Sequence, residues 1–312
     1  MARRSRAGLC VVVRNKIGYI LLPFRTTMRI LSALLVASLS MQGCVQTIAI
    51  RTVGGIMEYG FEAFNEESDL DLAREGLSGN LKLLEALIKG DPDNEQILLF
   101  AAQGYSAYAL AFAEDDSVER ARPIYLRARD YAFRILDQRS GFKNARKGSL
   151  EELRTAVSAL SKDDVPAVFW AAFSWGSYIN ITREDAIVMA DLSKVDALMD
   201  FVLVNDPSYY YGGADLYFGS IQGTIPAVLG GRPERSKEHF EKSLSFSGRK
   251  FLMAQVMYAK TYCVQVQDRD LYKKLLDEVG DASIDILPEV RLPNAVAKHK
   301  ARRLLSQIDE LF

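Results

Sequence analysis

Few residues of this chain have the types and spacing that catalysis or metal binding requires. His239 and His299 are the two histidines among 312 residues, and neither lies close in sequence to Cys263. A zinc site or a Cys-His nucleophile needs several such side chains brought together. We therefore expect no metal site, no cofactor and no catalytic residue, and the sequence predicts a protein that is not an enzyme. A hydrolase would need His239, Cys263 and a carboxylate to converge in one cleft.

The segment GSIQGTIPAVLGGRPERSKEHF contains four glycines and two prolines, a composition that could form a phosphate-binding loop. Such a loop follows a strand and carries a lysine-hydroxyl pair, and this segment has neither. A connection between two packed helices fits better. Gly219 and Gly223 lie one helical turn apart and leave room for close approach of another helix. Pro226 then kinks the helix near its end, Gly230 helps to end it, and Pro233 occupies the first turn of the next.

Aromatic residues offer a binding site rather than a catalytic one. Both tryptophans, Trp170 and Trp175, lie in VFWAAFSWGSYI, and the run Tyr209, Tyr210 and Tyr211 follows further along the chain. A helix that is apolar on more than one face is usually buried, so core packing explains these rings well. The functional alternative is that Trp170, Trp175, Tyr209 and Tyr210 line a concave or central channel for an apolar ligand.

Helical patterns must position these residues, because apolar side chains recur three and four residues apart over most of the chain. Clear examples are residues 81–88, 95–113, 119–136 and 193–204. No long alternating pattern of a β-strand competes with them. The sequence therefore predicts an all-α protein.

An internal repeat appears when the chain is shifted by 115 residues. Gly104 then coincides with Gly219, Ala121 with Ser236, and Tyr125 with Phe240. In tetratricopeptide repeats, small residues let paired helices pack closely and an aromatic side chain fills the space between neighbouring pairs. The proposed packing residues are Gly104, Ala121, Tyr125, Gly219, Gly223, Ser236 and Phe240. We expect about four degenerate tetratricopeptide-like helix pairs, stacked in a curved array, an α-solenoid.

The first 43 residues look like a targeting segment, because they carry seven of the 39 basic residues and no acidic one. Met28 is a candidate for the true start, and the apolar stretch after Arg29 is too short to span a membrane. Gly43 and Cys44 end this segment as in the bacterial lipobox, which predicts lipidation of Cys44. An ordinary signal peptide or an uncleaved anchor is the alternative. Residues 44–67 are then expected to form a tether, and residues 68–312 the helical repeat domain.

The charge of the remaining chain argues against a nucleic-acid partner. Removal of the leader leaves 32 basic and 40 acidic side chains, a formal charge of −8. Proteins that bind nucleic acid need a basic surface to neutralise phosphates. Of three cysteines, one lies in the leader and one is the candidate lipid site, so the fold needs no disulfide.

Together these features resemble the TatT family, the tetratricopeptide-like lipoprotein T component of tripartite ATP-independent periplasmic (TRAP) transporters. The resemblance covers about residues 69–312, and its most specific parts are LYFGSIQGTIPAVLGGRPERSKEHFEKSL and RLPNAVAKHKARRLLSQIDELF. It implies a non-enzymatic, membrane-tethered periplasmic subunit that forms a homotrimer and docks the transporter's substrate-binding protein. It also implies a hollow through which a small or hydrophobic ligand passes.

Two further expectations concern location and an alternative role. Val45 stands where an aspartate would resemble the inner-membrane retention signal, which favours the outer membrane. The alternative function is a free-standing tetratricopeptide scaffold for envelope protein assembly. Such a scaffold would present an exposed, charge-patterned groove for peptides in place of an aromatic-lined hollow.

Overall fold

The computed structural model describes residues 10–15, 18–23, 56–143, 145–225 and 231–312. It divides into two units, Met1–Gly55 and Ile56–Phe312. In the first unit, β1 (Cys10–Asn15) pairs antiparallel with β2 (Gly18–Pro23), so that Cys10 lies opposite Pro23. Met28, Cys44, Pro226 and Gly230, which carry the predictions on the leader and on the helix connection, lie outside the described residues.

The second unit, the helical body, contains no strand among its described residues, which confirms the all-α prediction for this part of the chain. Residues 56–65 are helical and precede α2. The α-helices are α2 (Leu70–Gly90), α3 (Glu95–Tyr108), α4 (Val118–Leu136), α5 (Leu150–Ser158), α6 (Val165–Asn180), α7 (Ala186–Met189), α8 (Leu192–Asn205), α9 (Tyr209–Thr224), α10 (Pro233–Phe246), α11 (Met253–Tyr258), α12 (Val264–Val266), α13 (Arg269–Asp281), α14 (Arg291–Ser306) and α15 (Ile308–Leu311). Two π-helical segments, η1 (Ala109–Ala113) and η5 (Ala259–Cys263), extend α3 and α11, and the 3₁₀ turns are η2 (Ala145–Lys147), η3 (Lys162–Asp164) and η6 (Pro288–Val290).

Side-chain caps fix where several of these helices begin. The Asp69 carboxylate accepts hydrogen bonds from the backbone N–H groups of Asp71 and Leu72 at the start of α2. Ser149 and Glu152 form a reciprocal capping box at the start of α5. Each cap satisfies amide groups that the helix leaves unpaired and contributes about 1 kcal/mol.

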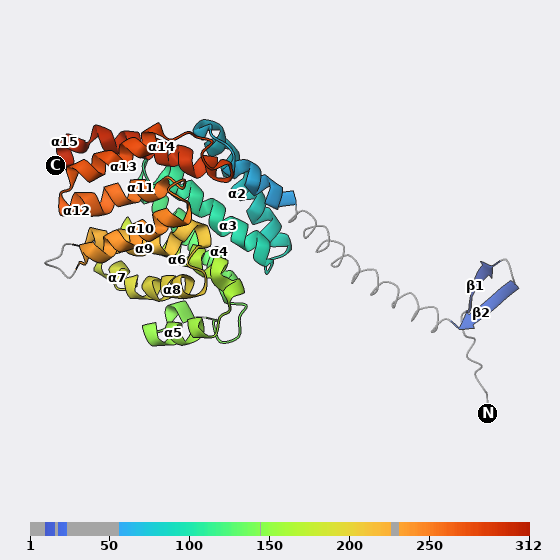
Figure 1. Ribbon diagram of the computed structural model, residues 1–312. Coiled ribbons are helices and arrows are strands. Elements are labelled where there is room, and N and C mark those ends of the chain that lie inside the picture. Colours follow the sequence, from blue (N-terminus) through green and yellow to red (C-terminus); the bar gives the residue numbers. More distant parts are fainter. Residues whose placement is uncertain (1–9, 16–17, 24–55, 144, 226–230) are drawn as a thin grey trace, which may run out of the picture. The chain divides into compact units, whose positions relative to one another are not determined.

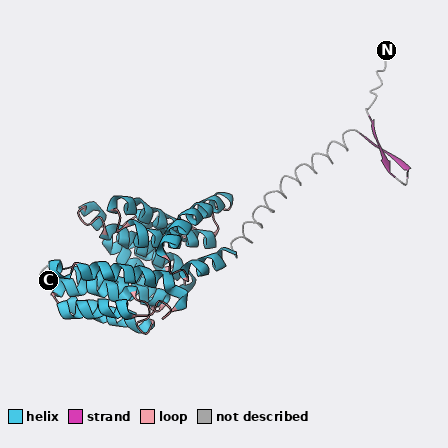
Figure 2. Ribbon diagram, turned by 90° about the horizontal axis from the view of Figure 1, so that it is seen from above, coloured by secondary structure: helices cyan, strands magenta, loops and turns pink. Residues whose placement is uncertain are grey.

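The long helices pack in consecutive pairs: α3 with α4, α6 with α8, α9 with α10, and α11–η5 with α13 (Figure 1). The first helix of each pair also packs against the first helix of the next, so these helices form an inner layer that ends with α14. The helix α14 in turn contacts α2, which packs on α3 (Figures 1 and 2). The two ends of the array therefore meet. The tetratricopeptide-like character of the pairs stays a prediction.

The glycine-rich segment begins inside α9 and ends inside α10, and its described residues hold these two helices close together. A Cβ atom on Gly219 would lie 3.0 Å from the ring of Phe240, and one on Gly223 would lie 2.5 Å from Ser236 Oγ. The Ser236 hydroxyl donates a 2.7 Å hydrogen bond to the Gly219 carbonyl. Phe240 is fully buried and stacks on Tyr258 with ring centroids 4.5 Å apart. These contacts leave no room for a side chain on either glycine.

The corresponding residues of the earlier pair lie in the equivalent helices, α3 and α4, but have different neighbours. Ala121 and Tyr125 are fully buried in α4. A Cβ atom on Gly104, however, would lie 2.9 Å from Leu81 of α2, so this glycine faces the preceding helix. Gly104 and Gly219 therefore occupy equivalent positions in the repeat but face different helices.

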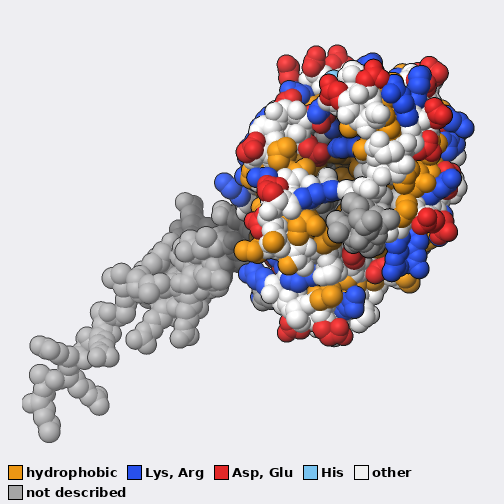
Figure 3. Space-filling model, turned by 90° about the vertical axis from the view of Figure 1, so that its left-hand side faces the viewer, with side chains coloured by type: hydrophobic (Ala, Val, Ile, Leu, Met, Phe, Trp, Pro, Cys, Tyr) orange, Lys and Arg blue, Asp and Glu red, His pale blue; other side chains and the backbone are white. Residues whose placement is uncertain are grey.

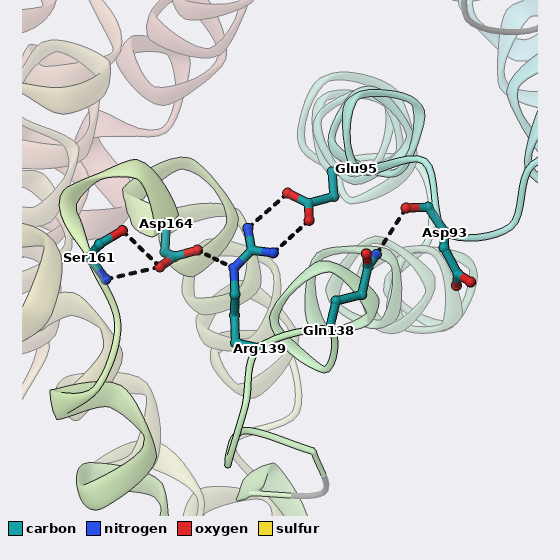
Figure 4. A network of polar contacts seen from close by, with 6 residues as sticks. All are labelled: Asp93, Glu95, Gln138, Arg139, Ser161 and Asp164. Carbon is teal, nitrogen blue, oxygen red and sulfur yellow. Dashed lines mark hydrogen bonds and ion pairs between the residues drawn. The ribbon is translucent and has the colours of Figure 1, made fainter. Parts of the chain in front are cut away.

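A polar network joins the ends of three helices around Arg139 (Figure 4). Its guanidinium donates to both carboxylate oxygens of Glu95, at 2.5 and 2.8 Å, and to Asp164 at 2.6 Å. The second oxygen of Asp164 accepts from the backbone N–H and the hydroxyl of Ser161. Burial opposes ionisation of Asp164, but the Ser161 amide and Arg139 outweigh it and lower its pKa. The network ties the N-termini of α3 and α6 to the C-terminus of α4.

Candidate functional site

A cavity of about 590 Å³ lies inside the helical body, within the range typical of small-molecule sites. Its wall comes mainly from the helices of the inner layer, which are α3–η1, α6, α9, α11–η5 and α14. The helix α2, which contacts both α3 and α14, completes it. Most of the wall is apolar. The aliphatic and methionine side chains of the lining include Leu77, Leu110, Leu216, Ile221, Met257 and Val296.

Five aromatic side chains form one end of the cavity, which we call the aromatic end: Phe169, Trp170, Phe173, Tyr210 and Phe251. The rings of Trp170 and Tyr210 lie 4.9 Å apart in an edge-to-face arrangement. Tyr210 also contacts Phe169 at 5.5 Å and Phe251 at 5.6 Å. Aromatic rings in such arrangements attract one another beyond their burial, so this end is rigid and strongly apolar.

Lining residues near the starts of the inner helices recur at a fixed interval in the sequence. Residues Phe169, Tyr210, Phe251 and Leu292 all line the cavity near the start of successive inner helices, and each is 41 residues from the next. The last three intervals of the inner layer are thus equal in length. The longer interval before α6 holds η2, α5 and η3.

Tyr210 lies in a strained stretch of backbone at the start of α9, which its ring contacts help to maintain. Tyr210, Tyr211 and Gly212 have φ angles of 47°, 58° and 74°, so three consecutive residues adopt the left-handed conformation. This costs about 1–2 kcal/mol for each residue with a side chain. The ring of Tyr211 stacks on Phe251 at 4.9 Å and offsets part of this cost. Strain of this kind concentrates at functional sites.

Six charged side chains line the cavity, and five of them form its other end, which we call the charged end: Glu114, Asp115, Lys260, Lys300 and Arg303. The sixth is Arg183, which donates a hydrogen bond to Asn180. Asp115 accepts a 2.6 Å hydrogen bond from Lys300 on one oxygen, and its other oxygen forms an ion pair with Arg303 at 2.9 Å. Lys260 lies 3.9 Å from Glu114, whose other oxygen accepts a 2.7 Å hydrogen bond from Tyr125. Three cations thus share two carboxylates at this end.

The protonation of Asp115 reflects this excess of positive charge. Burial alone would raise the pKa of its carboxyl group, but Lys300, Arg303 and Lys260 together lower it below the ordinary value. Asp115 is therefore ionised at neutral pH. Lys300 is 9% exposed, so its charge is held in a poorly solvated place.

Both π-helical segments lie at the charged end. Leu110, Ala111 and Phe112 of η1 and Lys260 and Thr261 of η5 line the cavity. A π-helical turn carries an extra residue and occurs frequently at functional sites. Here η1 ends directly before Glu114, and η5 contains Lys260, so the two segments position the acid and the base that approach each other.

The predicted aromatic residues separate into two groups. Trp170 and Tyr210 lie together on the cavity wall. Trp175 is 3% exposed and packs against Phe133 at 5.7 Å and beneath Arg129 at 5.6 Å, away from the lining. The hydroxyl of Tyr209 accepts a 3.3 Å hydrogen bond from the indole of Trp170, so Tyr209 supports the wall from behind.

The charged end was missed by sequence reasoning, although two of its residues, Lys300 and Arg303, lie in the C-terminal segment that carries the family resemblance. Asp115 and Lys300 are 185 residues apart, and no motif spacing connects them. Lys300 and Arg303 are three residues apart, about one turn of a helix, but this spacing alone does not indicate an acidic partner elsewhere in the chain.

The residues that a hydrolase would need do not form a nucleophilic pair. His239 Nδ1 lies 2.6 Å from Asp215, whose side chain is buried. Cys263 is fully buried, and burial raises the pKa of its thiol to about 12, so it stays protonated and unreactive. Among the described residues, no group of three or more His, Cys, Asp or Glu side chains is placed to hold a metal ion.

Acidic and basic side chains are interspersed over the face of the body seen in Figure 3, with hydrophobic patches between them. No described helix combines the length and hydrophobicity that crossing a membrane requires.

Comparison with known proteins gives one family. The model of the TRAP transporter T-component family matches residues 66–312, which include α2 and all the inner helices of the cavity wall. Among curated proteins, none matches the chain significantly. Since the match covers well over half of the sequence, this chain belongs to the TRAP transporter T-component family.

Proposed function

We propose that the protein is a periplasmic accessory subunit that docks the substrate-binding protein of a TRAP transporter and passes a small or hydrophobic ligand through its cavity. The observation that carries this proposal is the apolar, aromatic-lined cavity inside the helical body of a T-component. Burial of one methylene group in such a place gains about 0.8 kcal/mol. An apolar ligand would therefore leave water for this cavity readily.

Anchoring and assembly complete the proposal. A lipid on Cys44 would hold the body at a membrane leaflet, and Val45 after it favours the outer membrane. The family resemblance suggests a homotrimer. Radiolabelled palmitate should enter the wild-type protein and fail to enter Cys44→Ala, whereas continued labelling of Cys44→Ala would disprove lipidation at this residue.

The scaffold alternative, a tetratricopeptide protein for envelope assembly, requires an open groove that binds peptides. Here α14 contacts α2, so that the two ends of the array meet, and it carries part of the cavity wall. This arrangement favours a small ligand over an extended peptide.

Capture of the partner tests the docking proposal. The protein, extracted under native conditions after reversible cross-linking in cells, should co-purify with a TRAP substrate-binding protein identified by mass spectrometry. A second lipoprotein of similar size, purified in the same way, is the control. Repeated recovery of the T-component without any substrate-binding protein would refute the docking role.

A further inference from the structure

The cavity wall changes character from one end to the other, and the inner helices run in the same direction along it. On α6 the lining passes from Phe169 to Asn180, and on α14 from Leu292 to Arg303. At the start of the helices, Phe169, Tyr210 and Phe251 meet, as the ring contacts above establish. At their ends, Lys260 approaches Glu114, and Lys300 and Arg303 approach Asp115.

The two ends are far enough apart to hold different parts of one molecule. Nine residues separate Phe251 from Lys260 and eleven separate Leu292 from Arg303, which corresponds to about 13–16 Å at 1.5 Å per helical residue. Leu216, Met257 and Val296 lie between the ends and contribute only apolar atoms from their side chains. A hydrocarbon chain fits this middle section, and a charged group does not.

The charged end can accept an additional anion. Lys260 and Arg303 have side chains that are 45% and 48% exposed, so neither is enclosed by its present partner. Lys260, Lys300 and Arg303 together carry one positive charge more than Glu114 and Asp115 balance, and Arg183 adds a further positive charge to the lining. Each carboxylate is already engaged on both oxygens: Glu114 by the Tyr125 hydroxyl and the nearby Lys260, and Asp115 by Lys300 and Arg303. The two acids therefore offer little to an incoming cation or donor.

We propose that the cavity binds an amphiphilic anion, a hydrocarbon chain with one acidic head group, with the chain toward Phe169, Phe173 and Phe251 and the head group beside Lys260 and Arg303. This inference rests on the proposed ligand-handling function and adds to it the chemical class and the orientation of the ligand. A neutral apolar molecule would gain from the aromatic end and the middle section alone. A cationic amphiphile would meet the excess positive charge and bind more weakly than the neutral one.

Three probes with the same chain length separate these cases: dodecanoate, dodecanol and dodecyltrimethylammonium. Each is titrated into the purified full-length protein in a calorimeter, the two ions below their micelle concentrations and dodecanol below its solubility limit. We expect dodecanoate to bind at least about tenfold more tightly than dodecanol, because a charge-assisted hydrogen bond contributes about 1.5–3 kcal/mol and 1.4 kcal/mol is a factor of ten. Dodecyltrimethylammonium should bind most weakly. Equal affinity for dodecanoate and dodecanol would overturn the proposal.

Neighbouring arginines provide a matched pair of variants. Arg303 lines the cavity, whereas Arg302 on the same helix is exposed and lies outside the lining. Arg303→Gln should weaken dodecanoate binding about five- to tenfold and leave dodecanol binding unchanged. Arg302→Gln should change neither. Loss of affinity to the same extent in both variants would show only a general effect of positive charge and would refute a head-group site.

A variant at the aromatic end tests the orientation. Phe173→Ser should weaken dodecanoate and dodecanol by similar factors, because it changes the environment of the chain and not of the head group. Circular dichroism and thermal unfolding verify that each variant is folded. The outcomes also separate this inference from the proposed function: equal binding of the acid and the alcohol would refute the anionic class while leaving an apolar ligand in place. Absence of binding by all three probes would refute ligand handling itself, and capture of the substrate-binding protein tests docking independently.

Discussion

The close contact between α9 and α10 predicts how much a single methyl group added at Gly223 would destabilise the protein. A Cβ atom on Gly223 would lie 2.5 Å from Ser236 Oγ and 3.2 Å from both the backbone nitrogen and Cα of Tyr262. Ser236 is fully buried and donates its hydroxyl to the Gly219 carbonyl, so it cannot turn away without losing that bond. The Tyr262 backbone belongs to η5 and can move only with that segment.

The expected effect of Gly223→Ala is the difference between two opposing contributions. Alanine favours a helix over glycine by about 1 kcal/mol. Forcing an extra carbon into a packed contact costs about 1–3 kcal/mol, and the loss of the Ser236 hydrogen bond adds about 1 kcal/mol. We therefore expect the free energy of unfolding to fall by about 1–3 kcal/mol.

Gly79→Ala is the matched control, because Gly79 lies inside α2 and a Cβ atom there would have no neighbour within 4 Å among the described residues. The same substitution should then raise the free energy of unfolding by up to about 1 kcal/mol. Urea unfolding followed by circular dichroism measures both variants against the wild type. If Gly223→Ala were as stable as Gly79→Ala, the close approach of α9 to α10 and η5 would be refuted.

Three further predictions concern Phe240, Asp115 and Cys263. Phe240→Ala should lower the free energy of unfolding by about 3–5 kcal/mol, measured by urea unfolding, because the ring is fully buried and stacks on Tyr258; a loss below 1 kcal/mol would contradict that packing. The pKa of Asp115 is lowered in the folded state, so its ion pairs stabilise the protein fully above the ordinary carboxyl pKa, and this stability is lost as the pH falls through the lowered value. The melting temperature of Asp115→Asn should therefore fall less steeply on acidification than that of the wild type. An identical pH dependence of the two melting temperatures would contradict the ion pairing of Asp115. Cys263, whose thiol pKa is raised to about 12, should resist iodoacetamide at pH 8 until urea unfolds the protein, and mass spectrometry would detect earlier labelling.

The helices were predictable from the sequence because apolar residues at helical spacing record which side of each helix is buried. The segments 95–113, 119–136 and 193–204 all fall on observed helices. The two glycines that coincide on a shift of 115 residues, Gly104 and Gly219, lie in α3 and α9, the first helices of their pairs. The shift could not reveal that Gly104 faces Leu81 of α2, because the repeat carries no information about the helix that precedes the first pair.

The sequence likewise indicated one part of the candidate site and missed another. Trp170 and Tyr210 stand out as aromatic residues in the sequence, and both line the cavity. Trp175 has the same composition around it, yet packs against Phe133 in the body, because the two tryptophans point to different sides of one helix. The charged end depends on the meeting of η1 with α14, a contact between distant parts of the chain that local patterns do not encode.

The meeting of α14 with α2 also makes the interior of the protein depend on its last inner helix. The first pairs, α3 with α4 and α6 with α8, can form without that helix, since each packs only on its neighbours. The cavity cannot form without it, because residues from Leu292 to Gln307 supply one side of its wall. Truncation of the protein before Leu292 would leave most of the helix pairs intact and expose the aromatic interior to water.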